Sequence, residues 1–328
     1  MLAQGAGRHR PDPPERRSDS CVRGGPGRRG VSSLPIVAFQ GELGAFSEEA
    51  VQTWFGPDVE PLPCREFRQV GEAVRDGTAA AGLLPLENTL AGTVQPAYDV
   101  LLDPELIVVG EVIRPIRHFL LGLPGASLDA LRRVISHPVA LAQCGNFLSR
   151  HPSIEAVAVY DTAGAAIEVA AGKDPSVGAI ASKRAADRYG LAVLAPDLQD
   201  RSDNQTRFVV VRQRSGKALP QEQSDRGRTG AEGSGTSSAW KTALLVETEN
   251  RPGALVDILL PLSREGVNLT KLESRPGLTP WSYRFFLEFE GGPEEPRTAR
   301  ALEAVEEHAH SVRVLGTFRP WREGSGGG

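Results

Sequence analysis

A change of composition near residue 213 divides this 328-residue chain into two foldable parts. Residues 213–239 are rich in Gly, Ser, Gln, Arg and Glu, with hardly an apolar side chain. A structureless run of this length is unusual inside one compact domain, which favours a flexible linker. We therefore expect one domain before the linker and a second over residues 240–320, in keeping with the chain length.

Between residues 34 and 212, short apolar runs alternate with helical segments. Strands are predicted over residues 36–39, 79–84, 105–112, 134–135, 156–159 and 177–180. Helices are predicted over residues 46–55, 67–75, 94–102, 141–148, 163–171 and 184–189. This alternation predicts an α/β domain with mostly parallel sheets and helices on both faces.

Residues 240–320 show a different order of elements. The predicted order is strand, helix, strand, strand, helix, strand. The two strands without a helix between them lie near residues 267–274 and 281–289. This order is that of the ferredoxin-like βαββαβ unit. Pro261 falls inside the helix expected over residues 253–264, where proline removes a hydrogen bond.

The bulk composition excludes several classes of protein. A net charge of −4 gives no reason to expect nucleic-acid binding, and no apolar run approaches the roughly 20 residues of a membrane helix. The widely spaced Cys21, Cys64 and Cys144 form no C-x-x-C pair, which argues against disulfides or a zinc site and fits the cytoplasm. We expect no metal and no membrane partner.

Residues 1–33 carry seven Arg against three acidic residues and are rich in Pro, Gly and Ser. Such a segment buries too little apolar surface to offset its ordering entropy, so we expect a disordered leader. A transit peptide and a misassigned start near Val31 are two alternatives. Residues 321–328 are expected to be a disordered tail.

Three polar segments adjoin predicted strands. Glu87-Asn88-Thr89 follows one strand, Ser136-His137-Pro138 ends another, and Thr206-Arg207-Phe208 opens the apolar run after Gln205. Ligands of α/β proteins bind at such strand ends. Helix capping is the simpler explanation for Asn88, Thr89 and His137.

Two further segments fit either a structural or a binding role. Gly41 and Gly44 lie between a strand and a helix, which fits a tight turn or an anion site but not a dinucleotide or Walker motif. Asp161-Thr162 precedes a helix, where either residue is a good N-cap.

These segments resemble motifs of the prephenate dehydratase family. The family patterns are G-x-x-G-(T/A)-(F/Y)-S at Gly41, P-(I/L)-E-N-(S/T)-x-x-G-x-V at Pro85, S-H-P-x-x-x-x-Q-C at Ser136 and T-R-F at Thr206. Near the end, Gly253-Ala254-Leu255 and Glu273-Ser274-Arg275-Pro276 resemble the G-A-L and E-S-R-P motifs of the regulatory ACT domain. The resemblance covers roughly residues 34–320.

The resemblance implies a two-lobed α/β catalytic module, like periplasmic binding proteins, followed by a ferredoxin-like ACT domain. The module covers residues 34–212, with one lobe at about 34–110 plus 196–212 and the other at 111–195. The implied reaction is the decarboxylating dehydration of prephenate to phenylpyruvate in L-phenylalanine biosynthesis, without a cofactor. The expected catalytic residues are Thr206, Glu87, Asn88, Ser136 and Gln143; the expected substrate-binding residues are Thr89, Thr162, Arg207 and Phe208.

The chemistry gives two of these residues specific roles. Threonine is a poor acid, so we expect Thr206 to donate a hydrogen bond that strengthens in the transition state. Arg207 would pair with one of the two substrate carboxylates. Two departures from the family pattern stand out: Val139 replaces a common glutamine, and Asp161 resembles the subgroup of arogenate dehydratases. The choice between prephenate and arogenate therefore stays open.

The ACT resemblance implies regulation by L-phenylalanine bound where two ACT domains meet, and hence a homodimer or homotetramer. The implied effector site comprises Asn250, Gly253, Ala254, Leu255, Asn268, Leu269, Thr270, Glu273, Ser274 and Arg275. The 33 residues before Leu34 are too few for the chorismate mutase domain of many relatives. A non-catalytic two-lobed binding protein and an amino-acid sensor are the rival interpretations.

Overall fold

The computed structural model describes residues 34–219, 240–277 and 281–321. The expected leader, residues 220–239 of the expected linker and residues 322–328 of the expected tail lie outside these ranges. From Leu34 onward the chain forms one compact unit. No helix among the described residues is long and apolar enough to cross a membrane.

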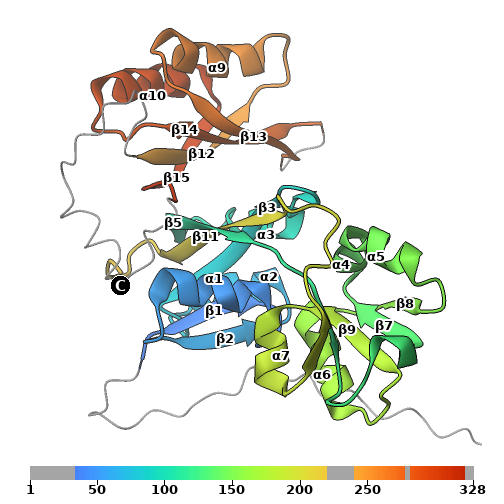
Figure 1. The fold of residues 1–328 in the computed structure, drawn as a ribbon. Helices are drawn as coiled ribbons and strands as arrows, with labels where there is room; N and C mark the ends of the chain where they lie inside the picture. Colours follow the sequence, from blue (N-terminus) through green and yellow to red (C-terminus); the bar gives the residue numbers. More distant parts are fainter. Residues whose placement is uncertain (1–33, 220–239, 278–280, 322–328) are drawn as a thin grey trace, which may run out of the picture. The chain divides into compact units, whose positions relative to one another are not determined.

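The first lobe is built on a six-stranded sheet (Figure 1). Its order is β2 (Glu60–Cys64), β1 (Ile36–Gln40), β3 (Ala81–Asn88), β11 (Gln205–Gln213) and β5 (Leu106–Pro115), with β4 (Gly92–Thr93) paired to β3. Three helices belong to this lobe: α1 (Phe46–Phe55), α2 (Phe67–Arg75) and α3 (Gln95–Val100). A capping box between Glu66 and Gln69 fixes the start of α2.

The second lobe is built on a five-stranded sheet. Its order is β10 (Ala192–Ala195), β6 (Phe119–Gly122), β9 (Val177–Ala181), β7 (Arg133–Ser136) and β8 (Glu155–Ala158). Its helices are η1 (Leu128–Ala130), α4 (Pro138–Gln143), α5 (Gly145–Arg150), α6 (Thr162–Ala171) and α7 (Lys183–Tyr189). Alanines of α6 and α7 pack against β9, which allows a close approach of helix and sheet.

Three expectations about these lobes were wrong. Both sheets are mixed rather than mostly parallel, because β11 returns antiparallel to β3 and β5, and β6 pairs antiparallel with β9 and β10. The lobe boundary does not fall at residue 110: pairing with β11 extends β5 to Pro115, and the chain enters the second lobe after it. The helix expected over residues 141–148 is two helices, which meet at the non-helical Cys144.

The C-terminal domain confirms the βαββαβ order. Its elements are β12 (Lys241–Thr248), α9 (Ala254–Arg264), β13 (Leu269–Pro276), β14 (Tyr283–Glu290), α10 (Pro296–His308) and β15 (Ser311–Phe318). The antiparallel sheet has the order β13-β14-β12-β15. Pro261 lies inside α9 and is buried, so burial of its ring accompanies the loss of one helical hydrogen bond.

A hydrophobic core lies on each face of this C-terminal sheet, although alternate side chains of its edge strand β13 are exposed. Leu244, Val246 and Leu287 pack with the helices α9 and α10. On the other face, Leu245, Phe286 and Leu315 share a hydrophobic core with residues of the first lobe, among them Tyr98 and Val108. The Tyr98 and Phe286 rings meet edge to face with centroids 4.9 Å apart. The C-terminal domain is therefore packed directly on the first lobe.

Candidate active site

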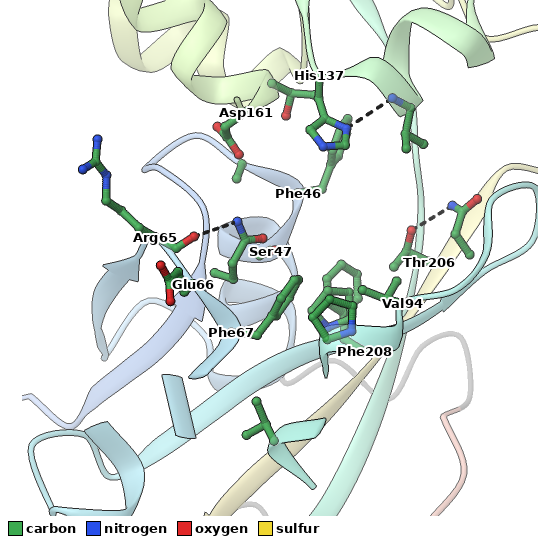
Figure 2. A pocket seen from close by; sticks show the side chains of 18 of the residues that line it. Phe46, Ser47, Arg65, Glu66, Phe67, Val94, His137, Asp161, Thr206 and Phe208 are labelled. Atoms are coloured by element: carbon green, nitrogen blue, oxygen red, sulfur yellow. Dashed lines mark hydrogen bonds between the residues drawn. The ribbon is translucent and has the colours of Figure 1, made fainter. Parts of the chain in front are cut away.

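A cleft of about 1000 Å³ is lined by residues of both lobes. The first lobe contributes Gln40, Phe46, Ser47, Asn88, Thr206 and Phe208 to its lining; the second contributes His118, His137, Gln143, Asp161 and Thr162. Figure 2 shows Thr206 and Phe208 on one side and His137 and Asp161 on the other. The lining is a mixture of aromatic surface and convergent polar groups, as in small-molecule sites.

The two central strands β3 and β11 divide their side chains between two faces. Asn88, Thr206 and Phe208 line the cleft, whereas their neighbours Glu87 and Arg207 do not. Successive side chains of a strand point to opposite faces, and Thr206 lies directly across from Asn88 in the antiparallel pair. Asn88 and Thr206 therefore face the cleft, whereas the adjacent Glu87 and Arg207 face the opposite side of the sheet.

Asn88 is held by hydrogen bonds on both ends of its side-chain amide. Its Oδ1 accepts from the backbone N–H groups of Leu90 and Ala91, at 2.9 and 2.8 Å. Its Nδ2 donates to Asn204 Oδ1 at 2.8 Å and to Thr206 Oγ1 at 2.9 Å. Because the Thr206 oxygen accepts from Asn88, its own hydrogen is available for donation into the cleft.

The network continues into the second lobe through Gln143. Gln143 Nε2 donates to Asn88 Oδ1 at 3.3 Å, and Gln143 Oε1 accepts from Asn204 Nδ2 at 2.9 Å. The same oxygen lies 2.9 Å from Nε2 of His118, which is 2% exposed. The sequence interpretation placed Asn88, Gln143 and Thr206 in one site, and the structure brings all three together.

The structure contradicts the expectation that Arg207 contacts the substrate. Its guanidinium makes a bidentate pair with Glu288 of β14, at 2.8 and 2.9 Å, and a third bond of 2.9 Å to Glu111 of β5. Lys241 Nζ also binds Glu111, at 2.9 and 3.0 Å. Burial raises the pKa of the Glu111 carboxyl, but Lys241 and Arg207 outweigh it and hold that pKa below its usual range.

Glu87 lies on this same rear face of the sheet. Its Oε1 accepts from Lys271 Nζ of β13 at 3.0 Å, and its Oε2 is 3.9 Å from Arg207 Nε. The Glu87 side chain therefore has no direct access to the cleft, because strand alternation turns it toward the C-terminal domain. The structure thus does not place Glu87 where its expected catalytic role requires it.

Two other expected site residues also lie outside the cleft lining. Ser136 is fully buried and donates to Ile180 O at 2.6 Å, which ties β7 to β9 beneath the His137 turn. Thr89 donates to Asp203 O at 2.9 Å and accepts from Gln205 N at 3.0 Å. Both hydroxyls hydrogen-bond to the backbone next to cleft residues and so hold those residues in position without lining the cleft themselves.

The capping roles considered for the second lobe are confirmed. His137 Nδ1 accepts from Val139 N at 3.2 Å at the start of α4, and Asp161 Oδ1 accepts from Gly164 N at 2.7 Å at the start of α6. Asp161 and Thr162 also line the cleft. Burial raises the pKa of Asp161, against the lowering effect of its backbone hydrogen bonds.

The glycine turn joins the two lobes. Gly41 and Gly44 have φ values of +113° and +94°, a region that favours glycine. Ser182 of the second lobe donates to Gly44 O at 2.6 Å, and Arg184 binds Glu48 of α1 at 2.7 Å. The turn therefore positions Phe46 and Ser47 at the cleft by contacts with α7.

Sequence reasoning missed His118 and did not include Asn204 among the site residues. Both lie in the connections between the lobes. These connections have no regular strand or helix periodicity from which the sequence could predict that a side chain faces the cleft. Among the described residues, no group of three or more His, Cys, Asp or Glu side chains is placed to hold a metal ion.

The expected effector residues surround α9 and β13. Gly253 is the N-cap of α9 with a left-handed φ of +84°. On β13, Glu273 accepts from Thr93 Oγ1 at 2.9 Å and Arg275 donates to Asp99 at 2.8 Å. Thr270 and Ser274 are exposed on the alternate face. Side chains of β13 thus reach the first lobe, while its other face is open.

Comparisons with known proteins agree with this architecture. The family model for prephenate dehydratase matches residues 37–216, and that for the ACT domain matches residues 242–307. Arogenate dehydratase/prephenate dehydratase 2 of Arabidopsis thaliana, a chloroplastic protein, is 38% identical over 292 residues, covering 86% of this chain and 72% of that protein.

Two solved structures show the same fold. The prephenate dehydratase of Arthrobacter aurescens in complex with L-Phe is 32% identical with a TM-score of 0.75, covering 87% of this chain and 89% of that one. GqqA, described as a novel type of quorum quenching acylase, is 35% identical with a TM-score of 0.76, covering 87% and 98%. The two-lobed module and the C-terminal ACT domain establish that this chain belongs to the prephenate dehydratase family.

Proposed function

We propose that this protein catalyses the decarboxylating dehydration of prephenate to phenylpyruvate. The observation that carries the proposal is the hydrogen-bonded set of Asn88, Gln143 and Thr206 in the interlobe cleft. In the reaction the bond from the ring to its hydroxyl breaks, the ring carboxylate leaves as carbon dioxide, and the released electron pair completes the aromatic ring. The departing hydroxide takes up one proton to become water.

The cleft residues are suited to stabilise the departing hydroxyl. Thr206 is 8% exposed, and Asn88 occupies its oxygen as an acceptor, so the Thr206 O–H is oriented by its surroundings rather than by solvent. A positioned donor of this kind stabilises developing negative charge on the leaving oxygen. Phe46 and Phe208 supply apolar surface for the ring, which favours a reaction that removes charge from the substrate.

Arogenate is a second candidate substrate, favoured by one observation. Asp161 places a carboxylate in the cleft lining, and arogenate carries an ammonium group where prephenate carries a keto oxygen. The name of the similar plant protein covers both activities. Replacement of Asp161 by Asn should therefore lower turnover of arogenate more than turnover of prephenate.

We further propose feedback regulation by L-phenylalanine at the ACT domain of an oligomer, in the cytoplasm. The solved relative in complex with L-Phe supports an effector of this kind. β13 is an edge strand of the described sheet and carries the expected effector residues, so a second copy could pair with it. Sedimentation of the purified protein with and without L-phenylalanine tests the assembly.

A kinetic assay of the purified protein tests the proposed reaction. Phenylpyruvate formation from prephenate and phenylalanine formation from arogenate would each be measured with and without added L-phenylalanine. Turnover of either substrate supports the reaction type. Binding of prephenate without turnover would instead support the rival class, a two-lobed ligand-binding protein.

A further inference from the structure

His118 is a buried residue of the cleft whose two ring nitrogens differ sharply in their surroundings. It lies in the connection between β5 and β6, is 2% exposed and lines the cleft. Its Nε2 is 2.9 Å from Gln143 Oε1, whereas its Nδ1 has no hydrogen-bond partner among the described residues. A buried nitrogen without a partner is costly in a folded protein, which makes this one a candidate ligand contact.

The hydrogen-bond network determines which nitrogen carries the proton. Two backbone N–H groups bind Asn88 Oδ1, so the Asn88 amide nitrogen must face Asn204 Oδ1. The Asn204 nitrogen then donates to Gln143, which identifies the Gln143 atom as its oxygen. An oxygen accepts, so His118 Nε2 is the donor and Nδ1 keeps its lone pair.

The surroundings keep His118 in this neutral form. Burial lowers the pKa of His118, against the opposing effect of the Gln143 hydrogen bond. The ring lies edge to face against Phe46, with centroids 5.5 Å apart. Gln199 Oε1 accepts from the His118 backbone N–H at 2.9 Å, which ties the two interlobe connections together. His118 therefore presents a fixed hydrogen-bond acceptor.

The proposed substrates offer few donors to such an acceptor. Prephenate has two carboxylates, a keto oxygen and one ring hydroxyl, so the hydroxyl is its single hydrogen-bond donor. Arogenate adds an ammonium group, for which the Asp161 carboxylate in the same lining is the better partner by charge. The ring hydroxyl is common to both substrates and is the group that leaves.

We propose that His118 Nδ1 accepts a hydrogen bond from the ring hydroxyl of the substrate and so turns a lone pair of that oxygen toward Thr206. Hydrogen bonds through Gln143 and Asn88 connect His118 with Thr206, so one network fixes both the acceptor and the donor. This assignment rests on the proposed function, because it requires a substrate with the leaving hydroxyl. His118 would act as a substrate-binding residue that is neutral throughout.

Two substitutions of His118 distinguish the effect of losing Nε2, which binds Gln143, from the effect of losing Nδ1, which is assigned to the substrate. His118→Gln keeps a terminal amide that can donate to Gln143 but removes the acceptor at Nδ1. His118→Asn keeps an oxygen near the position of Nδ1 but no longer reaches Gln143. His151→Gln is the matched control, since His151 lies outside the cleft lining and packs on Phe147.

The experiment compares the KM of prephenate with the Kd of phenylpyruvate, the product that lacks the hydroxyl, measured by calorimetry. We expect His118→Gln to raise the KM about 10- to 100-fold, the effect of leaving one hydroxyl unpaired, and to change the phenylpyruvate Kd less than about 2-fold. His118→Asn should recover part of the KM, and His151→Gln should match wild type in both.

Several results would overturn this role. An unchanged KM in His118→Gln, or equal weakening of prephenate and phenylpyruvate, would show that His118 is structural only. A larger effect on arogenate than on prephenate would assign Nδ1 to the ammonium group instead. Absence of wild-type turnover on both substrates would overturn the proposed function itself, and is thereby distinguished from failure of the His118 assignment.

Discussion

Replacement of Arg207 by Met tests whether the T-R-F arginine holds the protein together or binds substrate. The Arg207 side chain is 11% exposed and pairs with Glu111 and Glu288, which are 2% and 7% exposed. Removing one partner of a buried ion pair leaves a carboxylate unpaired and typically costs about 3–5 kcal/mol. Lys241 still reaches Glu111, but its Nζ is 3.9 Å from Glu288, so Glu288 loses most of its compensation.

This loss should appear as lower stability and not as weaker substrate binding. At about 2–4 °C per kcal/mol for a chain of this size, the thermal midpoint of Arg207→Met should fall by roughly 6–20 °C. Circular dichroism measures the midpoint, and steady-state kinetics well below it measures the KM of prephenate. The KM should change little, because Arg207 does not line the cleft.

Two variants serve as controls for this experiment. Arg207→Met combined with Glu288→Met removes both members of the pair and should recover much of the lost stability, because no unpaired charge is left. Arg201→Met removes an exposed pair with Asp203 and should leave the midpoint unchanged. A wild-type midpoint in Arg207→Met, together with a KM raised 100-fold, would refute the structural assignment and restore a substrate contact.

Three further predictions concern the site, the lobe contact and regulation. Thr206→Ala should lower kcat about 10²- to 10³-fold while Thr206→Ser retains most of it, because the donor is lost only in the first; near-normal turnover of the alanine variant would refute the role of Thr206. Glu48→Gln should lower the thermal midpoint at pH 7. Burial raises the pKa of Glu48, but Arg184 and the Gly44 N–H outweigh it and hold that pKa below its usual value of 4.5. The stability that the carboxylate contributes is thus present above pH 4.5 and is lost as the pH falls through the folded pKa, so the midpoint difference should shrink in acid; a constant difference from pH 7 to pH 3 would contradict this. Gly253→Ala should weaken the response to L-phenylalanine, because the φ of +84° disfavours a side chain at this helix start; an unchanged dose response would exclude Gly253 from the effector site.

The regular elements followed from local sequence patterns. The predicted helices over residues 46–55 and 67–75 have the observed bounds, and the order of elements in the ACT domain was correct. β2 was not predicted, because Pro61 and Pro63 remove ladder donors and strand patterns rarely include them. It is nevertheless a strand, since it pairs on one side with β1 at the edge of the sheet.

The motifs in the sequence indicate which segments form the site, but strand geometry decides which residues of each motif face the cleft. The structure brings Asn88, Gln143 and Thr206 together, whereas Glu87 and Arg207, which the family resemblance implied as site residues, lie outside the cleft lining. The two-residue period of a strand separates them, and the buried Glu288 on β14 that pairs with Arg207 lies 81 residues away in the chain. His118 could not be found this way, since only the folded connection between the lobes brings it to Gln143.

Turnover of the purified protein on prephenate and on arogenate, each with and without L-phenylalanine, tests the proposed function most directly. We expect phenylpyruvate formation from prephenate that responds to L-phenylalanine. Preference for arogenate would keep the reaction and the roles of the cleft residues but change the substrate. No turnover of either compound by folded protein would contradict the proposed function and leave a two-lobed protein that only binds its ligand.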